Sequence, residues 1–204
     1  MIGLRIDRRT SLWGVEDLSN VASIHYNPSH GYCTLFSKFY EDREYKKFIK
    51  NVERQVRSSR EYHMYVELLR TNISALNLDN ILSHITTEDA DLEFHHYPFS
   101  LYDMVDVMAI QKFFDAEDFT SLSLAKEVME LHYENLVGLV PLSKTTHELA
   151  HSGHLFLSAS QVFGDYKKFM EKYPSGISET LQAKIEEMED FTADNHPSDV
   201  KGLF

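Results

Sequence analysis

The sequence predicts an α+β protein that is predominantly helical. Over most of the chain, apolar residues recur at helical spacing between capping signals, which indicates amphipathic helices. Two short apolar runs, residues 92–96 and 136–142, interrupt this pattern and are typical of strands. The first helical stretch extends from about residue 41 to residue 70. It contains no Gly or Pro, and its apolar positions Tyr45, Ile49, Val52 and Val56 follow the helical period.

Capping and turn signals divide the rest of the chain into further elements. We expect a strand at 154–157 and helices at about 73–85, 100–114, 121–133, 159–172 and 178–191, with one more helix that starts at Ser143 or Thr145. The chain then falls into an N-terminal mixed region with a basic helix (1–90), a central region with a helical insert at about 98–134 (91–157), and C-terminal helices with an acidic tail (158–204). Residues 1–40 hold only short β-like pieces, and the tail is expected to be disordered.

The composition excludes several classes of protein. No run approaches the roughly 18 apolar residues that a membrane helix needs, and the first ten residues lack the apolar segment of a signal peptide. The single Cys33 excludes a disulfide framework and a zinc ribbon with paired CxxC motifs. We therefore expect a soluble cytoplasmic protein without a membrane partner.

The charge of the chain is unevenly distributed. The net charge is −12, but residues 1–70 hold 12 Lys and Arg against 9 Asp and Glu. One face of the first helical stretch carries basic residues displaced by two positions, or about 200°, from its apolar face. This stripe is either a solvated surface or a track for the phosphates of DNA. Its members include Lys47, Lys50, Arg54 and Arg57.

Four of the eleven histidines form two pairs with chemical significance. His147 and His151 are four residues apart on an expected helix, so their imidazoles project from one face and can share a divalent ion. His95 and His96 are neighbours on an expected strand and point to opposite sides. One of them can bind a metal while the other acts as a general base. Taken alone, each pair is also compatible with an ordinary surface.

Together these segments resemble the HNH (ββα-metal) endonucleases, in the colicin-DNase-like variant with two histidines on each half. Leu92-Glu93-Phe94-His95-His96 is similar to the first strand of that motif. The stretch from Gly138 to Gly153 is similar to its second half, a strand, a turn and a helix that bears HxxxH. The resemblance covers residues 92–97 and 135–154, and it makes residues 91–157 a ββα-metal core with helical elaborations.

The resemblance implies a role for each matched residue. His95, His147 and His151 would bind one divalent ion (Zn, Mg, Mn or Ni), and His96 would be the general base. Glu93 matches an acidic residue of the colicin-type enzymes. The Asn of the family pattern falls on Gly138, so Asn135, three residues earlier, is the candidate for that role. The long spacer from Tyr97 to Glu134 and the missing CxxC pairs also depart from many relatives.

Two functions follow as hypotheses. The first is a metal-dependent endonuclease that hydrolyses DNA phosphodiester bonds, with RNA as a lesser option. The second is a non-catalytic interaction protein that keeps the HNH fold and a structural metal, and whose acidic C-terminal region meets a protein partner. Compact HNH proteins with long helical inserts are frequent in phage genomes, so the resemblance suggests a phage origin. A phage-encoded protein would then be located in the host cytoplasm. Residues 198–204 loosely resemble tails that dock on replication clamps, but a frayed terminus is the favoured explanation.

Overall fold

Two antiparallel strands lie at the centre of the described part of the chain. The computed structural model describes residues 42–194, and its sheet consists of β1 (Leu92–His96) and β2 (Leu139–Ser143). Leu92 pairs with Ser143 and His96 with Leu139, so the C-terminal end of β1 meets the start of β2. The expected strands 92–96 and 136–142 are thus present, the second of them shifted by a few residues.

Helices make up most of the remaining described residues, and the predominantly helical α+β class is confirmed. Among them no helix is long and apolar enough to cross a membrane. The helices are α1 (Asp42–Ser58), α2 (Arg60–Asn72), α3 (Leu101–Phe114), α4 (Ser121–Tyr133), α5 (Lys144–His151), α6 (Tyr166–Lys172) and α7 (Glu179–Asp194), with short 3-10 turns η3 (Ser74–Asn77) and η4 (Ala159–Gln161).

The chain divides into two units, Met1–Lys47 and Phe48–Phe204, with the division inside α1. Of the first unit the structure describes only the beginning of α1, where Lys47 pairs with Glu44 at 2.6 Å. All the other described elements belong to the second unit. The predicted domain boundaries at residues 90/91 and 157/158 stay predictions.

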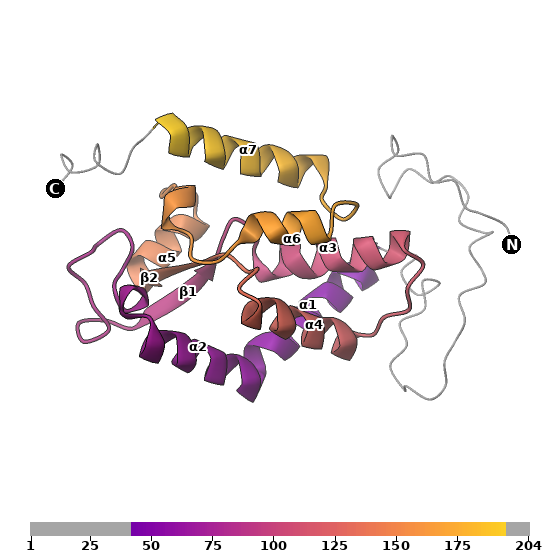
Figure 1. Cartoon of the computed structure of the whole chain (residues 1–204), viewed down its shortest axis with the longest axis horizontal. Coiled ribbons are helices and arrows are strands. Elements are labelled where there is room, and N and C mark those ends of the chain that lie inside the picture. The colour runs from indigo at the N-terminus through magenta and orange to yellow at the C-terminus, as the bar shows by residue number, and fades with distance from the viewer. Residues whose placement is uncertain (1–41, 195–204) are drawn as a thin grey trace, which may run out of the picture. The chain divides into compact units, whose positions relative to one another are not determined.

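The two faces of the strand pair are covered by different helices. α5 packs on one face of β1 and β2 (Figure 1). α2 covers the other face, where Arg70 lies over the Phe94 ring and Tyr62 stacks on His96. Because side chains alternate along a strand, Glu93 and His95 face α5, while Phe94 and His96 face α2. The two neighbouring histidines therefore lie on opposite faces of the strand pair.

Apolar side chains from distant segments hold the strand pair in place. Val140, Leu142 and Leu157 form a buried cluster beside β2. α3 packs against α4 and buries six apolar side chains of its own, from Leu101 to Ala109. Both helices begin with a capping box, and for α4 a cap signal before residue 121 predicted this start. The hairpin of α3 and α4 is joined to the rest of the fold where α4 contacts α2.

Four expected elements differ from the structure. The stretch 41–70 is two helices, because Ser59 takes an extended conformation and caps α2 by accepting from Tyr62 N–H. Residues 73–85 form only a short 3-10 turn, and 154–157 form no strand. The helix expected at 159–172 starts at Tyr166, after the 3-10 turn η4.

Side-chain hydrogen bonds explain why residues 73–85 do not continue as a helix. Asn77 donates to the backbone carbonyl of Arg70, and Asn80 donates to that of Gln161. Asp79 accepts from the backbone N–H groups of Ile81 and Leu82. Such bonds compete with the helical pattern. The β-like pieces in 1–40, the expected disordered tail and the residues 198–204 lie outside the described residues.

Candidate metal centre

Three histidine side chains converge on the face of the sheet that α5 covers. One ring nitrogen each from His95, His147 and His151 can be chosen so that all three lie within 4.8 Å of one another. The ring centroids are 4.9 Å apart for His95 and His147, 4.8 Å for His95 and His151, and 4.5 Å for His147 and His151. The structure thus brings together the three residues that the sequence pattern predicted as ligands.

A strand, a turn and a helix position these side chains. His95 stands on β1 opposite Val140 of β2. β2 ends at Ser143, and α5 begins with the next residue, so the helix turns back over the strand that it has just followed. The four-residue spacing of His147 and His151 places both on the side of α5 that faces β1. His95 and His147 are partly buried, and His151 is exposed, so the cluster is open to solvent on one side.

A carboxylate orients one of the three rings. His147 Nδ1 lies 2.5 Å from Glu93 Oε2, and Glu93 is on the same face of β1 as His95. The ring nitrogen donates to the carboxylate, which leaves Nε2 with its lone pair for a cation. A carboxylate behind a histidine in this way fixes the tautomer of a metal ligand and raises its basicity. Glu93 therefore supports the cluster from behind.

The environment favours the neutral imidazole at His95 and His151, which is the state that binds metal. Burial lowers the pKa of His95 to about 4, with a further contribution from the neighbouring His147 and His151. The pKa of His151 is also lowered, by burial and by the nearby His147 and Arg57. Three imidazole nitrogens make this a donor set suited to zinc or another borderline divalent ion.

His96 lies on the opposite face of β1 from this cluster. Its side chain is buried, stacks on the Tyr62 ring, and places Nε2 3.1 Å from Nε2 of His132 in α4. The expectation that His96 faces the substrate as a general base is therefore wrong for its orientation. Its neighbour His95 occupies the face turned toward α5, and strand alternation sends His96 inward.

The hydrogen bonds of the buried pair fix where its protons are. His132 Nδ1 lies 2.7 Å from the Val128 carbonyl, so it donates there and its Nε2 is an acceptor. His96 Nε2 must then donate to His132, and His96 Nδ1 is left as a buried acceptor without a partner. Both rings are neutral, and burial lowers the pKa of His132 to about 4 and that of His96 well below its usual value.

We expect this buried pair to make the fold acid-sensitive. His132 has a pKa near 4 in the folded protein and about 6.5 when unfolded, so between these values the unfolded chain binds a proton that the folded chain does not. The free energy of unfolding should thus fall as pH drops from 6.5 to 4, by about 3 kcal/mol from His132 alone. Urea unfolding at pH 7, 5.5 and 4 in the presence of a chelator measures this.

Two variants control the acid experiment. His132→Leu should make the fall in stability toward acid pH smaller, because it removes one of the titrating groups. His63→Gln, at an exposed position of α2, should keep the parental dependence. A parental protein that is equally stable at pH 7 and pH 4 contradicts the expectation.

The position of the family Asn is closed to side chains. The Gly138 carbonyl accepts from Tyr97 N–H. A Cβ built on Gly138 would lie 1.9 Å from the Tyr97 carbonyl oxygen and 2.8 Å from Val162 Cγ1. Asn135 lies in the turn before β2, exposed and with a φ of 62°. Its carbonyl accepts from Asp165 N–H. The bracing role assigned to Asn135 stays a prediction.

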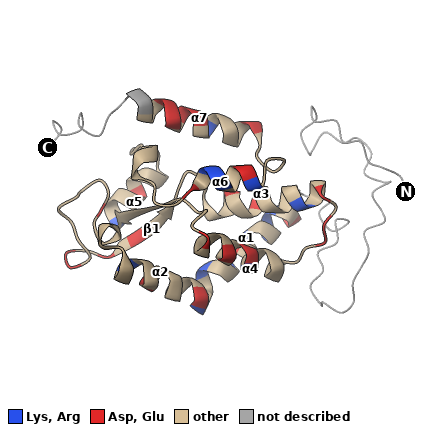
Figure 2. Cartoon of the chain, in the orientation of Figure 1, with Lys and Arg blue, Asp and Glu red and all other residues tan. Residues whose placement is uncertain are grey.

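The basic residues predicted to contact DNA lie on α1, and their side chains are exposed. Arg57 is ion-paired with Glu53 at 3.1 Å, and Arg54 donates to Asn51. Burial is the main cause of the lowered pKa of His95, His96 and His151, and the positive charge of Arg57 adds to it on both faces of β1. Acidic residues gather instead on α4 and α7 (Figure 2).

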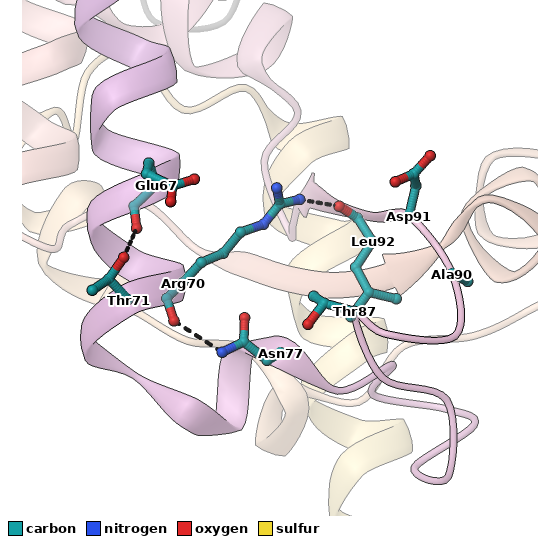
Figure 3. A pocket seen from close by; sticks show the side chains of 8 residues that line it. All are labelled: Glu67, Arg70, Thr71, Asn77, Thr87, Ala90, Asp91 and Leu92. Carbon is teal, nitrogen blue, oxygen red and sulfur yellow. Dashed lines mark hydrogen bonds between the residues drawn. The ribbon is translucent and has the colours of Figure 1, made fainter.

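A separate pocket of about 250 Å³ lies between α2 and the start of β1, and none of its residues belongs to the histidine cluster. Arg70 crosses it to donate to the Leu92 carbonyl, while Asn77 donates to the Arg70 carbonyl (Figure 3). The carboxylates of Glu67 and Asp91 also line it. Sequence reasoning did not find Arg70, which ties α2 to β1.

Comparison with known proteins shows the family to which the chain belongs. The family model described as Bacteriophage G278-like virion protein matches residues 19–202. The chain belongs to this bacteriophage virion protein family. The phage origin that the sequence suggested agrees with it, and the match says nothing about HNH endonucleases. No curated protein and no solved structure matches the chain.

Proposed function

We propose that this member of the G278-like virion family is a metal-dependent nuclease of the HNH type, which hydrolyses phosphodiester bonds of DNA. The observation that carries the proposal is the convergence of His95, His147 and His151 on a strand–strand–helix unit with one side open to solvent. A structural zinc site is usually closed by four protein ligands, whereas a catalytic site keeps one position for water or substrate.

The residues present fit a divalent ion. The donors are three imidazole nitrogens, and at separations within 4.8 Å small side-chain rotations bring them onto one cation. Zinc–nitrogen bonds of about 2.0–2.1 Å require only such adjustments. An ion held there would supply Lewis-acid catalysis at a phosphate oxygen and favour ionisation of water near neutral pH.

The protein's own residues would then orient the metal ligands and bind the DNA backbone. Glu93 accepts from His147 Nδ1 and so leaves Nε2 as the nitrogen available to an ion. Arg57 brings positive charge toward the imidazoles, and we propose that it contacts a phosphate next to the scissile bond, with Lys50 and Arg54 farther along α1 on the backbone. Lys47 would extend this track. No side chain is assigned as general base, because His96 is buried away from the open side.

A second candidate is a non-catalytic virion component with a metal-stabilised fold. Two observations favour it: His96 is bonded to His132 inside the protein, and Gly138 leaves no room for the Asn of the family pattern. The excess of acidic residues after residue 70, 23 against 8 basic ones, also suits a protein partner better than DNA. In this case the histidines would hold a metal without turnover.

Supercoiled plasmid distinguishes the two candidates. The full chain is incubated with plasmid and Mg²⁺, Mn²⁺, Ni²⁺ or Zn²⁺, and gel electrophoresis follows relaxed and linear DNA. The nuclease predicts cleavage that a chelator stops and that His95→Ala reduces by more than about a hundredfold, since loss of transition-state stabilisation of about 2.7 kcal/mol has that effect. His84→Ala, at an exposed histidine outside the cluster, is the control. A protein that binds metal but cleaves plasmid with none of the four ions is the non-catalytic virion component.

A further inference from the structure

A buried carboxylate from a distant loop holds the start of α5. Asp79 is fully buried, and no sequence pattern singled it out. Its Oδ2 accepts from the backbone N–H of Ser143 and from the hydroxyl of Thr146, both at 2.7 Å. Its Oδ1 accepts from the N–H groups of Ile81 and Leu82, at 2.8 and 2.9 Å. Four donors therefore satisfy one carboxylate, which is what a buried charge requires.

The hydrogen bonds to Ser143 and Thr146 replace an ordinary helix cap. Ser143 is the N-cap residue of α5 but makes no side-chain hydrogen bond to the helix backbone. The negative charge of Asp79 stands at this helix N-terminus instead, where it is favourable to the helix dipole. Burial alone raises the pKa of Asp79, but the hydrogen bonds from Thr146, Leu82 and Ser143 outweigh it and leave the pKa below its usual value. Asp79 is thus ionised at neutral pH.

The attachment of Asp79 is next in sequence to the candidate metal ligand. Thr146 is buried and faces Asp79, and the following residue, His147, projects toward Glu93. Two carboxylates therefore hold successive residues of α5, one from behind the helix and one from β1. A rotation of α5 that keeps one of these bonds would break the other, because successive helical residues are about 100° apart.

We propose that Asp79 is a positioning residue for the metal centre, which through Ser143 and Thr146 fixes the rotation of α5 and so the place of His147 Nε2 relative to His95. This inference rests on the metal site of the proposed function. Asp79 does not touch the ion or the substrate. It acts through the first turn of the helix, as outer-shell partners of metal ligands do.

The test compares variants at Thr146 with a matched control elsewhere. Thr146→Val removes one hydroxyl of the Asp79 network, and Thr146→Ser keeps it. The control is Thr192→Val, because the Thr192 hydroxyl likewise bridges two segments, accepting from Ala159 N–H and donating to the Met188 carbonyl. Asp79→Asn is the stronger variant, since it replaces one of the two accepting oxygens with an NH2 group that faces N–H or O–H donors and cannot accept from them.

Two readouts are measured on the full-length folded protein. The first is the Kd for Co²⁺ or Zn²⁺ alone. The second is the imidazole ¹H–¹⁵N spectrum of metal-free protein, which reports the His147–Glu93 hydrogen bond. We expect Thr146→Val to weaken metal binding about tenfold and to shift the His147 signal. Thr146→Ser should behave like the parent, and Thr192→Val should lose stability without either change.

The outcomes separate this inference from the proposed function. A Thr146→Val protein that is less stable but keeps the parental Kd and the parental His147 signal overturns the positioning role. A parental protein that binds neither ion overturns the metal centre, and the His147 signal of the variants then still decides whether Asp79 sets the rotation of α5. If Asp79→Asn does not fold, the Thr146 series gives the answer alone.

Discussion

His147→Ala should weaken the binding of Zn²⁺ or Co²⁺ by more than about a hundredfold, because loss of an outer-shell partner alone reduces affinity about 10–100-fold. The substitution removes one of three nitrogens and leaves the Glu93 carboxylate without its partner. The remaining pair, His95 and His151, cannot hold an ion against water with comparable strength. Competition between the protein and a chelator of known affinity measures the Kd.

Two further variants make this experiment specific. Glu93→Gln keeps all three imidazoles but cannot accept from the His147 ring as an anion, so it should fall between the parent and His147→Ala. His154→Ala should bind metal like the parent, because His154 lies beyond the end of α5 and bonds to Ser152 outside the cluster. If His154→Ala and His147→Ala weaken binding equally, the ion sits elsewhere and the three-histidine centre is refuted.

The faces on which the three histidines lie were predictable, because each rests on short-range periodicity. A spacing of four residues puts His147 and His151 on one side of any helix, and alternation puts Glu93 and His95 on one side of any strand. The sequence did not contain the fact that the two elements pack face to face. That step came from the resemblance to the strand–turn–helix motif, and the pairing of β1 with β2 agrees with it.

The orientation of His96 depended on contacts that no local pattern encodes. Alternation predicts that His95 and His96 point in opposite directions, but not which of the two faces solvent. The answer comes from Tyr62 in α2 and His132 in α4, which lie 34 and 36 positions away in sequence and fill the far side of β1. A lone histidine such as His132 gives no signal before the fold places it beside another.

Asp79 shows the same limit for a supporting residue. The helix expected at about 73–85 gives Asn77, Asp79 and Asn80 no special role. In the structure all three side chains bond to backbone groups, and Asp79 is the most buried of them. Periodicity alone cannot distinguish a solvated polar residue from one that organises a loop.

Gly138→Ala is expected to lower the free energy of unfolding by about 3 kcal/mol or more, at the upper end of the range for overpacked sites. A Cβ would meet the backbone carbonyl oxygen of Tyr97 at 1.9 Å, and a backbone atom cannot move aside as a flexible side chain can. The Tyr97 N–H also donates to the Gly138 carbonyl, so the strand pair has to separate at this point. Urea unfolding of parent and variant measures the difference.

Gly153→Ala provides the contrast for this substitution. Gly153 has a φ of +72° but no atom within 4 Å of a built Cβ, so only the left-handed backbone penalty of about 1–2 kcal/mol applies. If Gly138→Ala lowers the free energy of unfolding no more than Gly153→Ala does, the close approach of the two strands at Gly138 is contradicted. Tyr97 directly follows His96, so a forced separation there also displaces His95. Gly138→Ala should therefore weaken metal binding, while Gly153→Ala leaves it intact.

The contact with the Tyr97 carbonyl also means that Gly138→Asn cannot restore the Asn of the HNH pattern at this position. A brace in this chain has to come from another residue.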